Sequence, residues 1–190
     1  MLERRHVVKS LLEGRQNALV VTGLGSPTYD VAATSPCDKN YYLWGAMGGS
    51  VMMGLGLALA RADEHVIVIT GDGEALMGMG SLATVGVLQP QNLSIVVLDN
   101  EHYGETGMQQ SHMGLGVDLA AVAKACGISN ARMVDSEPDL QDLIDNFHRR
   151  DGVQFVQIKI DSQMPSRVMP TRDAVENKIS FRKALGVHSV

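Results

Sequence analysis

The sequence predicts an α/β protein built on a doubly wound, mostly parallel sheet flanked by helices. Strand-like and helix-like segments alternate along its 190 residues, as they do in βαβ units. Val66 to Thr70 is a continuous β-branched run that ends at a glycine, which is typical of a strand buried on both faces. Three glycine-bearing loops each follow a predicted strand. They can therefore meet at the carboxyl edge of the sheet, where ligands bind in such folds.

The first half of the chain supplies three predicted helices and two predicted strands. Residues 3–13 carry apolar side chains at helical spacing, which predicts an amphipathic helix. Residues 18–22 are a short apolar run that breaks at glycine and predicts a buried strand. Residues 48–61 and 75–88 bear many Met and Gly residues and predict helices, with the strand at 66–70 between them.

The second half continues the alternation. Residues 94–98 predict the next strand, and a polar loop follows from Asp99 to about Gly116. A helix is predicted at 117–126, a short strand at 131–134, and a helix at 137–150 that a serine N-cap opens.

The chain ends in a strand and an arm. Residues 153–160 alternate apolar and polar side chains, which predicts a strand. The last residues contain two prolines and predict an arm with a short basic helix around Phe181. We therefore expect one cofactor-binding domain over residues 1–163 and a C-terminal arm, residues 164–190, that packs on this domain or on a partner.

Composition excludes several classes of function. The net charge is −5 and no long basic run occurs, so neither nucleic acid nor a membrane surface is an expected partner. The N-terminus lacks the pattern of a signal peptide, and Cys37 and Cys126 follow no metal or redox spacing, which favours the cytoplasm. No Lys or Arg occurs between Arg61 and Lys124. A phosphate bound by that glycine-rich segment would need backbone N–H groups, a helix N-terminus or a metal.

Two short polar motifs point to a metal site. Gly71-Asp72-Gly73-Glu74 follows one predicted strand and Asp99-Asn100 follows the next, with one helix and one strand between them. Asp72 and Asn100 should therefore lie on neighbouring strand ends, where carboxylate and amide oxygens suit Mg²⁺ and a diphosphate. Each motif alone is more often a turn or an Asx cap. Together, at this spacing, they favour the metal site.

These motifs resemble those of the thiamine-diphosphate enzymes, in which Gly-Asp-Gly is followed after some two dozen residues by two asparagines. The resemblance implies that thiamine diphosphate and Mg²⁺ bind here. It also implies that Asp72, Asn100 and the backbone carbonyl of His102 are the metal ligands. Asp99 stands where the family has its first asparagine, while the ligand position is kept.

Further cofactor contacts follow from the same resemblance. Gly45-Ala46-Met47-Gly48 resembles the segment whose apolar side chain wedges between the two cofactor rings, which implies that role for Met47 and a hydrogen bond to the aminopyrimidine for the Gly45 carbonyl. The full set of implied cofactor-binding residues is Gly25, Ser26, Gly45, Met47, Asp72, Gly73, Glu74, Asn100, Tyr103 and Gly104. Gly23-Leu-Gly25-Ser26-Pro27 lacks the third glycine of a dinucleotide-binding fingerprint, so NAD is discounted.

The loop from Asp99 to Gln109 and the tail from Pro170 resemble the branch that contains the β subunits of sulfopyruvate decarboxylases and the phosphonopyruvate decarboxylases. In that family a separate pyrimidine-binding domain carries the glutamate that activates the cofactor. The resemblance therefore implies an α subunit as partner, a small 2-oxo acid as substrate, and no activating role for Glu74 or Glu105. The carboxy-lyase would be active only in the pair.

The residues that face the substrate are the least defined by sequence. Thr106 and His112 are the candidate catalytic residues in the loop after the metal motif, for which a solvated loop is the alternative. The substrate's charge could be met by His112, by organised N–H groups, by the partner, or by Arg167 or Arg172. Two other functions share the cofactor residues: a carboligase of the acetolactate synthase kind, and a catalytically silent cofactor-binding module.

Overall fold

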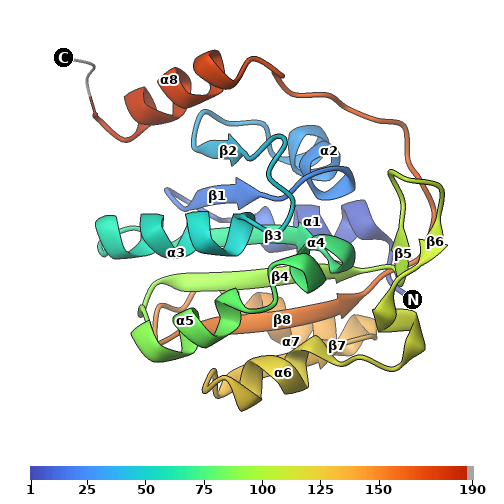
Figure 1. Ribbon diagram of the computed structural model, residues 1–190. Coiled ribbons are helices and arrows are strands. Elements are labelled where there is room, and N and C mark those ends of the chain that lie inside the picture. Colours follow the sequence, from blue (N-terminus) through green and yellow to red (C-terminus); the bar gives the residue numbers. More distant parts are fainter. Residues whose placement is uncertain (188–190) are drawn as a thin grey trace.

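The computed structural model describes residues 1–187 and confirms the doubly wound α/β fold (Figure 1). Six parallel strands form the sheet in the order β2-β1-β3-β4-β8-β7, and a short antiparallel hairpin, β5-β6, stands apart. The strands are β1 Leu19–Thr22, β2 Asn40–Tyr42, β3 Val66–Gly71, β4 Leu93–Asp99, β5 His102–Tyr103, β6 Gln109–Gln110, β7 Asn130–Val134 and β8 Gln154–Lys159. From β1 the chain moves to β2 on one side and later to β3 on the other, so the topological switch point lies between β1 and β3.

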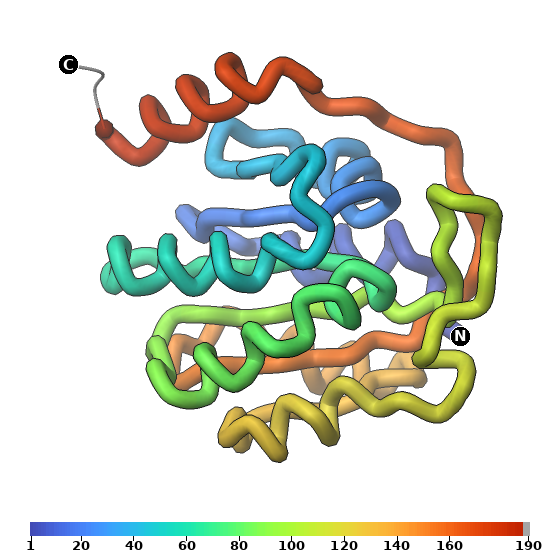
Figure 2. The backbone as a smooth tube through the Cα atoms, viewed as in Figure 1, coloured from blue at the N-terminus to red at the C-terminus, as the bar shows by residue number. Residues whose placement is uncertain are grey.

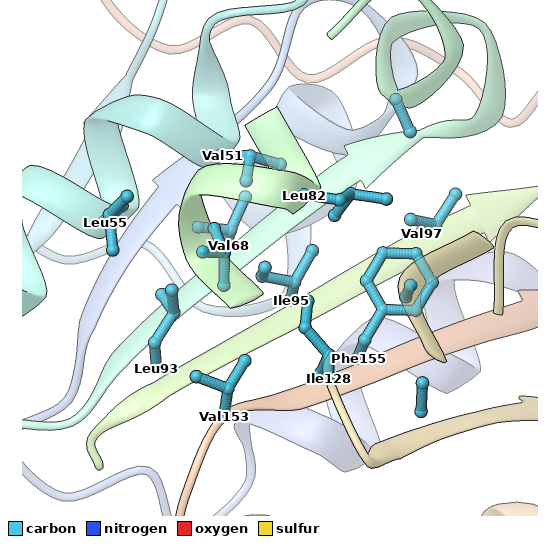
Figure 3. Close-up of a cluster of buried hydrophobic side chains, with 14 of the residues drawn as sticks. Val51, Leu55, Val68, Leu82, Leu93, Ile95, Val97, Ile128, Val153 and Phe155 are labelled. Atoms are coloured by element: carbon cyan, nitrogen blue, oxygen red, sulfur yellow. The ribbon is translucent and has the colours of Figure 1, made fainter. Parts of the chain in front are cut away.

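Helices cover both faces of the sheet. They are α1 Arg4–Leu12, α2 Ser26–Thr34, α3 Ser50–Ala60, α4 Asp72–Met77, α5 Ser81–Leu88, α6 Leu119–Ala125, α7 Glu137–Phe147 and α8 Ala174–Ala184, with a 3₁₀ helix η1 at His112–Leu115. One face packs against α3, α5 and α6 through a core that includes Val68, Ile95 and Phe155 (Figure 3). The other face packs against α1, α2 and α7 through a second apolar core. None of the helices in the described residues has the length and apolar character that a bilayer crossing requires.

Two elements near the first strand were not predicted. Helix α2 begins at Ser26. Gly23, Gly25 and Pro27 indicate only a turn in the sequence, but proline is also favourable in the first turn of a helix. Strand β2 has three residues, too few for a periodic pattern. The predicted helix at 75–88 is in fact two helices, because the chain turns between Met77 and Ser81. The first of these helices already begins at Asp72 and therefore includes the metal motif.

Both ends of the chain pass the carboxyl edge of the sheet. Leu2 forms a parallel bridge with Ile160, directly after β8, so helix α1 starts at this edge. After β8 the chain runs beside the β5-β6 hairpin and crosses to α8, which packs against β2 (Figure 2). Trp44 Nε1 donates to the Thr171 carbonyl at 2.8 Å, and Asn177 Nδ2 donates to the Tyr42 carbonyl at 2.9 Å. The C-terminal arm is thus fastened to the residues that lead into the predicted cofactor loop.

A buried histidine at the opposite edge should make stability depend on pH. Burial lowers the pKa of His65 to about 4, with His148 and Arg150 acting in the same direction, and His65 Nε2 lies 2.8 Å from Ser94 Oγ. Protonation therefore favours the unfolded chain, and this contribution to stability is complete above the unfolded pKa of 6.5 and lost as the pH falls towards 4. We expect the free energy of unfolding to fall by about 2 kcal/mol between pH 8 and pH 5 from this group.

Urea unfolding of the chain and of a His65→Gln variant at the two pH values measures this contribution. Carboxylates titrate in both proteins, so the difference between their pH slopes isolates His65. Equal slopes would mean that His65 does not carry the effect.

Candidate active site

A cavity of about 140 Å³ lies at the carboxyl edge of the sheet, at the ends of β1, β3 and β4. Its position includes the switch point between β1 and β3, where open α/β sheets bind ligands. The lining residues are Arg4, Leu24, Ser26, Pro27, Met47, Gly71, Asp72, Gly73, Glu74, Leu98, Asn100, His102, Tyr103, Gly104, Glu105, Thr106 and Ile160. The three predicted glycine-bearing loops thus meet at one edge.

Most of the residues predicted for the site line this cavity. They are Ser26, Met47, Asp72, Gly73, Glu74, Asn100, His102, Tyr103, Gly104 and Thr106. Gly25 lies beside it as the N-cap of α2, at a φ of +79° that favours glycine. Gly45 is exposed and has no atom within 4 Å of the place a Cβ would occupy.

The structure separates the two candidate catalytic residues. Thr106 lines the cavity, but its hydroxyl donates to Gln109 Oε1 at 2.9 Å and closes the β5-β6 hairpin. His112 is exposed at the start of η1 and is not among the lining residues. Only Thr106 is brought to the cavity in this chain.

The three candidate metal ligands lie together in the cavity. Asp72 Oδ2 accepts a hydrogen bond from the Ser111 hydroxyl at 2.5 Å, which fixes the carboxylate at the start of α4. Asn100 Oδ1 accepts from the His102 N–H at 3.0 Å, so an Asx turn also forms here. Burial is the main cause that raises the pKa of Asp72 to about 6, and the nearby Asp99 raises it further. A buried carboxylate of this kind is stabilised by a cation.

The lining chemistry fits a divalent cation. It has one guanidinium group, that of Arg4, and the three carboxylates of Asp72, Glu74 and Glu105, a formal charge of −2. The candidate ligands are a carboxylate, an amide and a backbone carbonyl, the hard oxygen donors that Mg²⁺ prefers. Helix α2 opens at this cavity without a side-chain cap. Pro27 has no N–H and the Thr28 N–H donates to the Gly25 carbonyl at 3.0 Å, so the Ser26 N–H is the donor at this helix start that suits an anion. The residues therefore fit a metal-bound diphosphate.

Only glycine fits at position 73, because the Tyr103 ring lies against the backbone there. A Cβ at this position would lie 2.5 Å from the Tyr103 ring and 3.6 Å from Met47 Cε. Tyr103 therefore lies directly against the backbone of the metal motif. Met47 stands at the rim with 40% of its surface exposed, well placed for a ligand that extends out of the cavity.

Glu74 holds neighbouring loops in place. Its carboxylate accepts from the Leu24 N–H at 2.7 Å and from the Ser50 N–H at 3.4 Å, although it is buried. A Cβ on Gly23 would lie 1.6 Å from Glu74 Oε2, so only glycine leaves room for this carboxylate. The glutamate of the motif thus joins the loop after β1 to the start of α3.

The aspartate that departs from the family pattern has its own partners. Asp99 is fully buried, and its Oδ2 accepts from Gln157 Nε2 and Lys159 Nζ, each at 2.8 Å. Burial lowers the pKa of Lys159, but Asp99 and Glu101 outweigh that effect and the pKa is raised. The charge that Asp99 introduces is therefore neutralised by a lysine from the adjacent strand β8.

Sequence reasoning missed the arginine that lines the cavity. Arg4 is 3% exposed, and its Nε and Nη2 contact Asp30 Oδ2 at 2.7 Å and 2.6 Å. Arg5 Nε contacts Asp30 Oδ1 at 3.1 Å. Burial raises the pKa of Asp30 and the two guanidinium groups oppose that rise. Removal of one partner from such a buried pair typically costs about 3–5 kcal/mol.

The cavity contains a basic residue even though the central segment of the sequence has none. The segment from residue 62 to 123 has none, as the sequence states, but the fold brings Arg4 to the cavity from the N-terminal helix. No local motif marks Arg4, because its role depends on where α1 begins. Arg167 also comes near: it pairs with Glu105 at 3.2 Å and lies over the Tyr29 ring at 5.6 Å.

Comparisons with known proteins match this chain over most of its length. Residues 25–158 match the family model described as the thiamine pyrophosphate enzyme, C-terminal TPP binding domain. A sulfopyruvate decarboxylase subunit beta of Methanococcus maripaludis is 37% identical over 95% of both chains. A phosphonopyruvate decarboxylase of Streptomyces viridochromogenes is 39% identical over 79% of this chain and 37% of its own. Benzoylformate decarboxylase from Polynucleobacter necessarius has the same fold, with a TM-score of 0.69 over 86% of this chain and 34% of its own, at 20% identity.

Proposed function

This chain belongs to the thiamine pyrophosphate enzymes as their C-terminal cofactor-binding domain, and on that premise we propose that it is the β subunit of a 2-oxo acid decarboxylase. It holds the diphosphate of thiamine diphosphate through Mg²⁺, and its substrate is sulfopyruvate or phosphonopyruvate. The observation that carries the proposal is the convergence of Asp72, Asn100 and His102 in one cavity at the switch point of the sheet. The names of the two relatives supply the reaction class and the substrates.

Different residues of this chain bind different parts of the cofactor in this proposal. Asp72, Asn100 and the His102 carbonyl hold the metal, and Ser26 at the start of α2 offers its N–H to the diphosphate. Met47 at the rim supports the bent cofactor, and Tyr103 closes the wall beside Gly73. Thiamine diphosphate, when bound, supplies the ylid and the electron sink for decarboxylation. The chain's own residues orient the cofactor and keep water from one side of it.

A second subunit completes the site in this proposal. The cavity of about 140 Å³ is smaller than the ~300–1,000 Å³ that ligand pockets usually have. The partner is an α subunit with the pyrimidine-binding domain and the activating glutamate, consistent with the name "subunit beta" of the relative. Its contribution would cover the exposed side of the cofactor.

The exposed apolar surface of α3, α4 and α5 suits this partner. These helices and their connection present a set of outward apolar side chains: Met52, Met53, Leu59, Met77, Met79, Val87 and Leu88. We call this set the α3–α5 surface. It continues towards the cavity rim, because a Cβ on Gly48, next to Met47, would lie 3.1–3.3 Å from atoms of Met77 and Gly78. Exposed apolar side chains that gather on neighbouring helices mark protein interfaces, and unbranched methionine adapts to a partner.

The test is CO₂ release from sulfopyruvate, phosphonopyruvate and pyruvate with thiamine diphosphate and Mg²⁺. We expect activity only when the chain is co-expressed with its α subunit, because the activating glutamate lies on the partner. The acid with the highest kcat/KM identifies the substrate. Activity of the chain alone would contradict the split site.

The same assay decides between this function and the alternatives. Products that contain a new carbon–carbon bond, rather than CO₂ and an aldehyde, would favour a carboligase. Cofactor binding without turnover in the pair would favour the catalytically silent module. The two decarboxylase relatives are 37% and 39% identical to this chain, and their names favour the first outcome.

A further inference from the structure

One nitrogen of the Arg4 guanidinium group, Nη1, takes no part in the ion pair with Asp30. Nε and Nη2 both contact Asp30 Oδ2, and among the described residues no hydrogen bond is formed by Nη1. Arg4 is 3% exposed and lines the cavity, so this N–H group is held in a largely dry position in a residue of the cavity lining. Asp30 and Arg5 fix this orientation from the far side.

The fold brings Arg4 to the cavity through the start of α1. The bridge between Leu2 and Ile160 fixes the start of α1 at the carboxyl edge, next to the end of β8. Arg4 is the first residue of α1, which covers one sheet face together with α2, whereas Met47 precedes α3, which covers the other face (Figure 1). Arg4 and Ser26 also line a second, smaller cavity. Arg4 thus lies on the side of the site where α2 begins, and Met47 lies on the opposite side.

We infer that Arg4 is a guanidinium ligand for the terminal phosphoryl group of thiamine diphosphate. The inference rests on the proposed function and extends it to a residue outside the sequence motifs. Among the residues that line the cavity, Arg4 is the only lysine or arginine. A planar guanidinium group, locked by a carboxylate and with N–H donors remaining, is the side chain that phosphate oxygens bind best.

The position favours the cofactor over the substrate as the source of the anion. The substrate reacts at the cofactor ring, which Met47 supports on the opposite side of the cavity in the proposed function. A sulfonate or phosphonate of the substrate has the same tetrahedral oxyanion chemistry, so the experiment must separate the two. Loss of discrimination between thiamine diphosphate and thiamine monophosphate identifies a contact with the terminal phosphoryl group.

The test is calorimetric binding of thiamine diphosphate and of thiamine monophosphate to the assembled enzyme at saturating Mg²⁺. The variants are Arg4→Gln and, as a matched control, Arg5→Gln. Arg5 is adjacent in sequence and contacts the same aspartate, but it does not line this cavity. We expect Arg4→Gln to weaken diphosphate binding at least tenfold and monophosphate binding less than threefold. Arg5→Gln should change both less than threefold.

Folding is controlled by a double variant. Arg4→Gln leaves Asp30 with one partner, so Arg4→Gln/Asp30→Asn removes both charges and should show the same loss of diphosphate binding. Equal losses for both ligands, equal effects of the Arg4 and Arg5 variants, or unchanged binding would overturn the inference. A raised KM for the sulfonated or phosphonated acid with unchanged cofactor affinity would assign Arg4 to the substrate. An unaltered enzyme that shows no Mg²⁺-dependent binding would overturn the proposed function itself.

Discussion

Replacing Asp72 with asparagine should abolish Mg²⁺-dependent binding of thiamine diphosphate and, with it, CO₂ release by the assembled enzyme. Asparagine keeps the shape of the side chain but removes the charge and one of the two carboxylate oxygens. Changes in residues that only support metal ligands cost about 10–100-fold in affinity or activity, so loss of a ligand should exceed about 100-fold. Calorimetry at several Mg²⁺ concentrations and the CO₂ assay measure the two effects.

The same substitution should stabilise the metal-free chain. The folded pKa of Asp72 is raised from 3.8 to about 6, chiefly by burial. Its ionised form therefore opposes folding at pH 7, and a neutral amide should raise the free energy of unfolding by about 1–3 kcal/mol. More stability with less binding is the signature of a carboxylate kept for a ligand. A variant that is less stable and still binds cofactor would show that Asp72 is a structural residue.

The matched control is Asp118→Asn. The Asp118 carboxylate accepts from the Ala121 N–H at 2.9 Å and caps α6 from an exposed position. This change should cost at most about 1 kcal/mol of stability and leave cofactor binding unchanged. Loss of binding in the control would mean that the assay reports folding rather than metal coordination.

The strands were predictable because burial on both faces leaves a continuous apolar pattern. Val66–Gly71 and Leu93–Asp99 were predicted to within a residue or two for this reason. Helix α2 was missed because a glycine and a proline at its start read as a turn, and its polar content hides the buried face. The break between α4 and α5 was missed because the Met- and Gly-bearing segment 75–88 predicts one helix. Periodicity identifies elements, but it does not show where a short helix stops.

The site was predictable where its residues are close to strand ends. Asp72 and Asn100 follow adjacent strands, so their proximity in the cavity follows from the parallel sheet. Arg4, Lys159 and Ser111 were not found, because each acts through a contact with a residue 26 or more positions away. His112 is close in sequence to the β5-β6 hairpin, which ends at Gln110. The 3₁₀ helix that begins at His112 nevertheless leaves its side chain exposed. Short-range spacing thus predicts metal ligands better than it predicts their supporting charges.

A charge on the α3–α5 surface should prevent assembly with the α subunit and abolish activity. Val87 on α5 is 82% exposed and Met53 on α3 is 39% exposed, so glutamate at both positions should leave the fold of this chain intact. Burial of unpaired charges at an interface costs several kcal/mol, and each 1.4 kcal/mol is tenfold in affinity. Association of the Val87→Glu/Met53→Glu chain with its partner should therefore weaken by more than about 100-fold, as measured by analytical ultracentrifugation.

The control places the same charge on an exposed apolar residue elsewhere. Val175 on α8 is 59% exposed and lies outside the α3–α5 surface, so Val175→Glu should assemble and turn over as the unaltered pair does. Normal assembly of the double variant would mean that the partner binds another face. Because the surface begins at the rim of the cavity beside Met47, a partner that binds it is also the partner that covers the cofactor. Loss of assembly and loss of turnover should therefore occur together, and only in the variant of that surface.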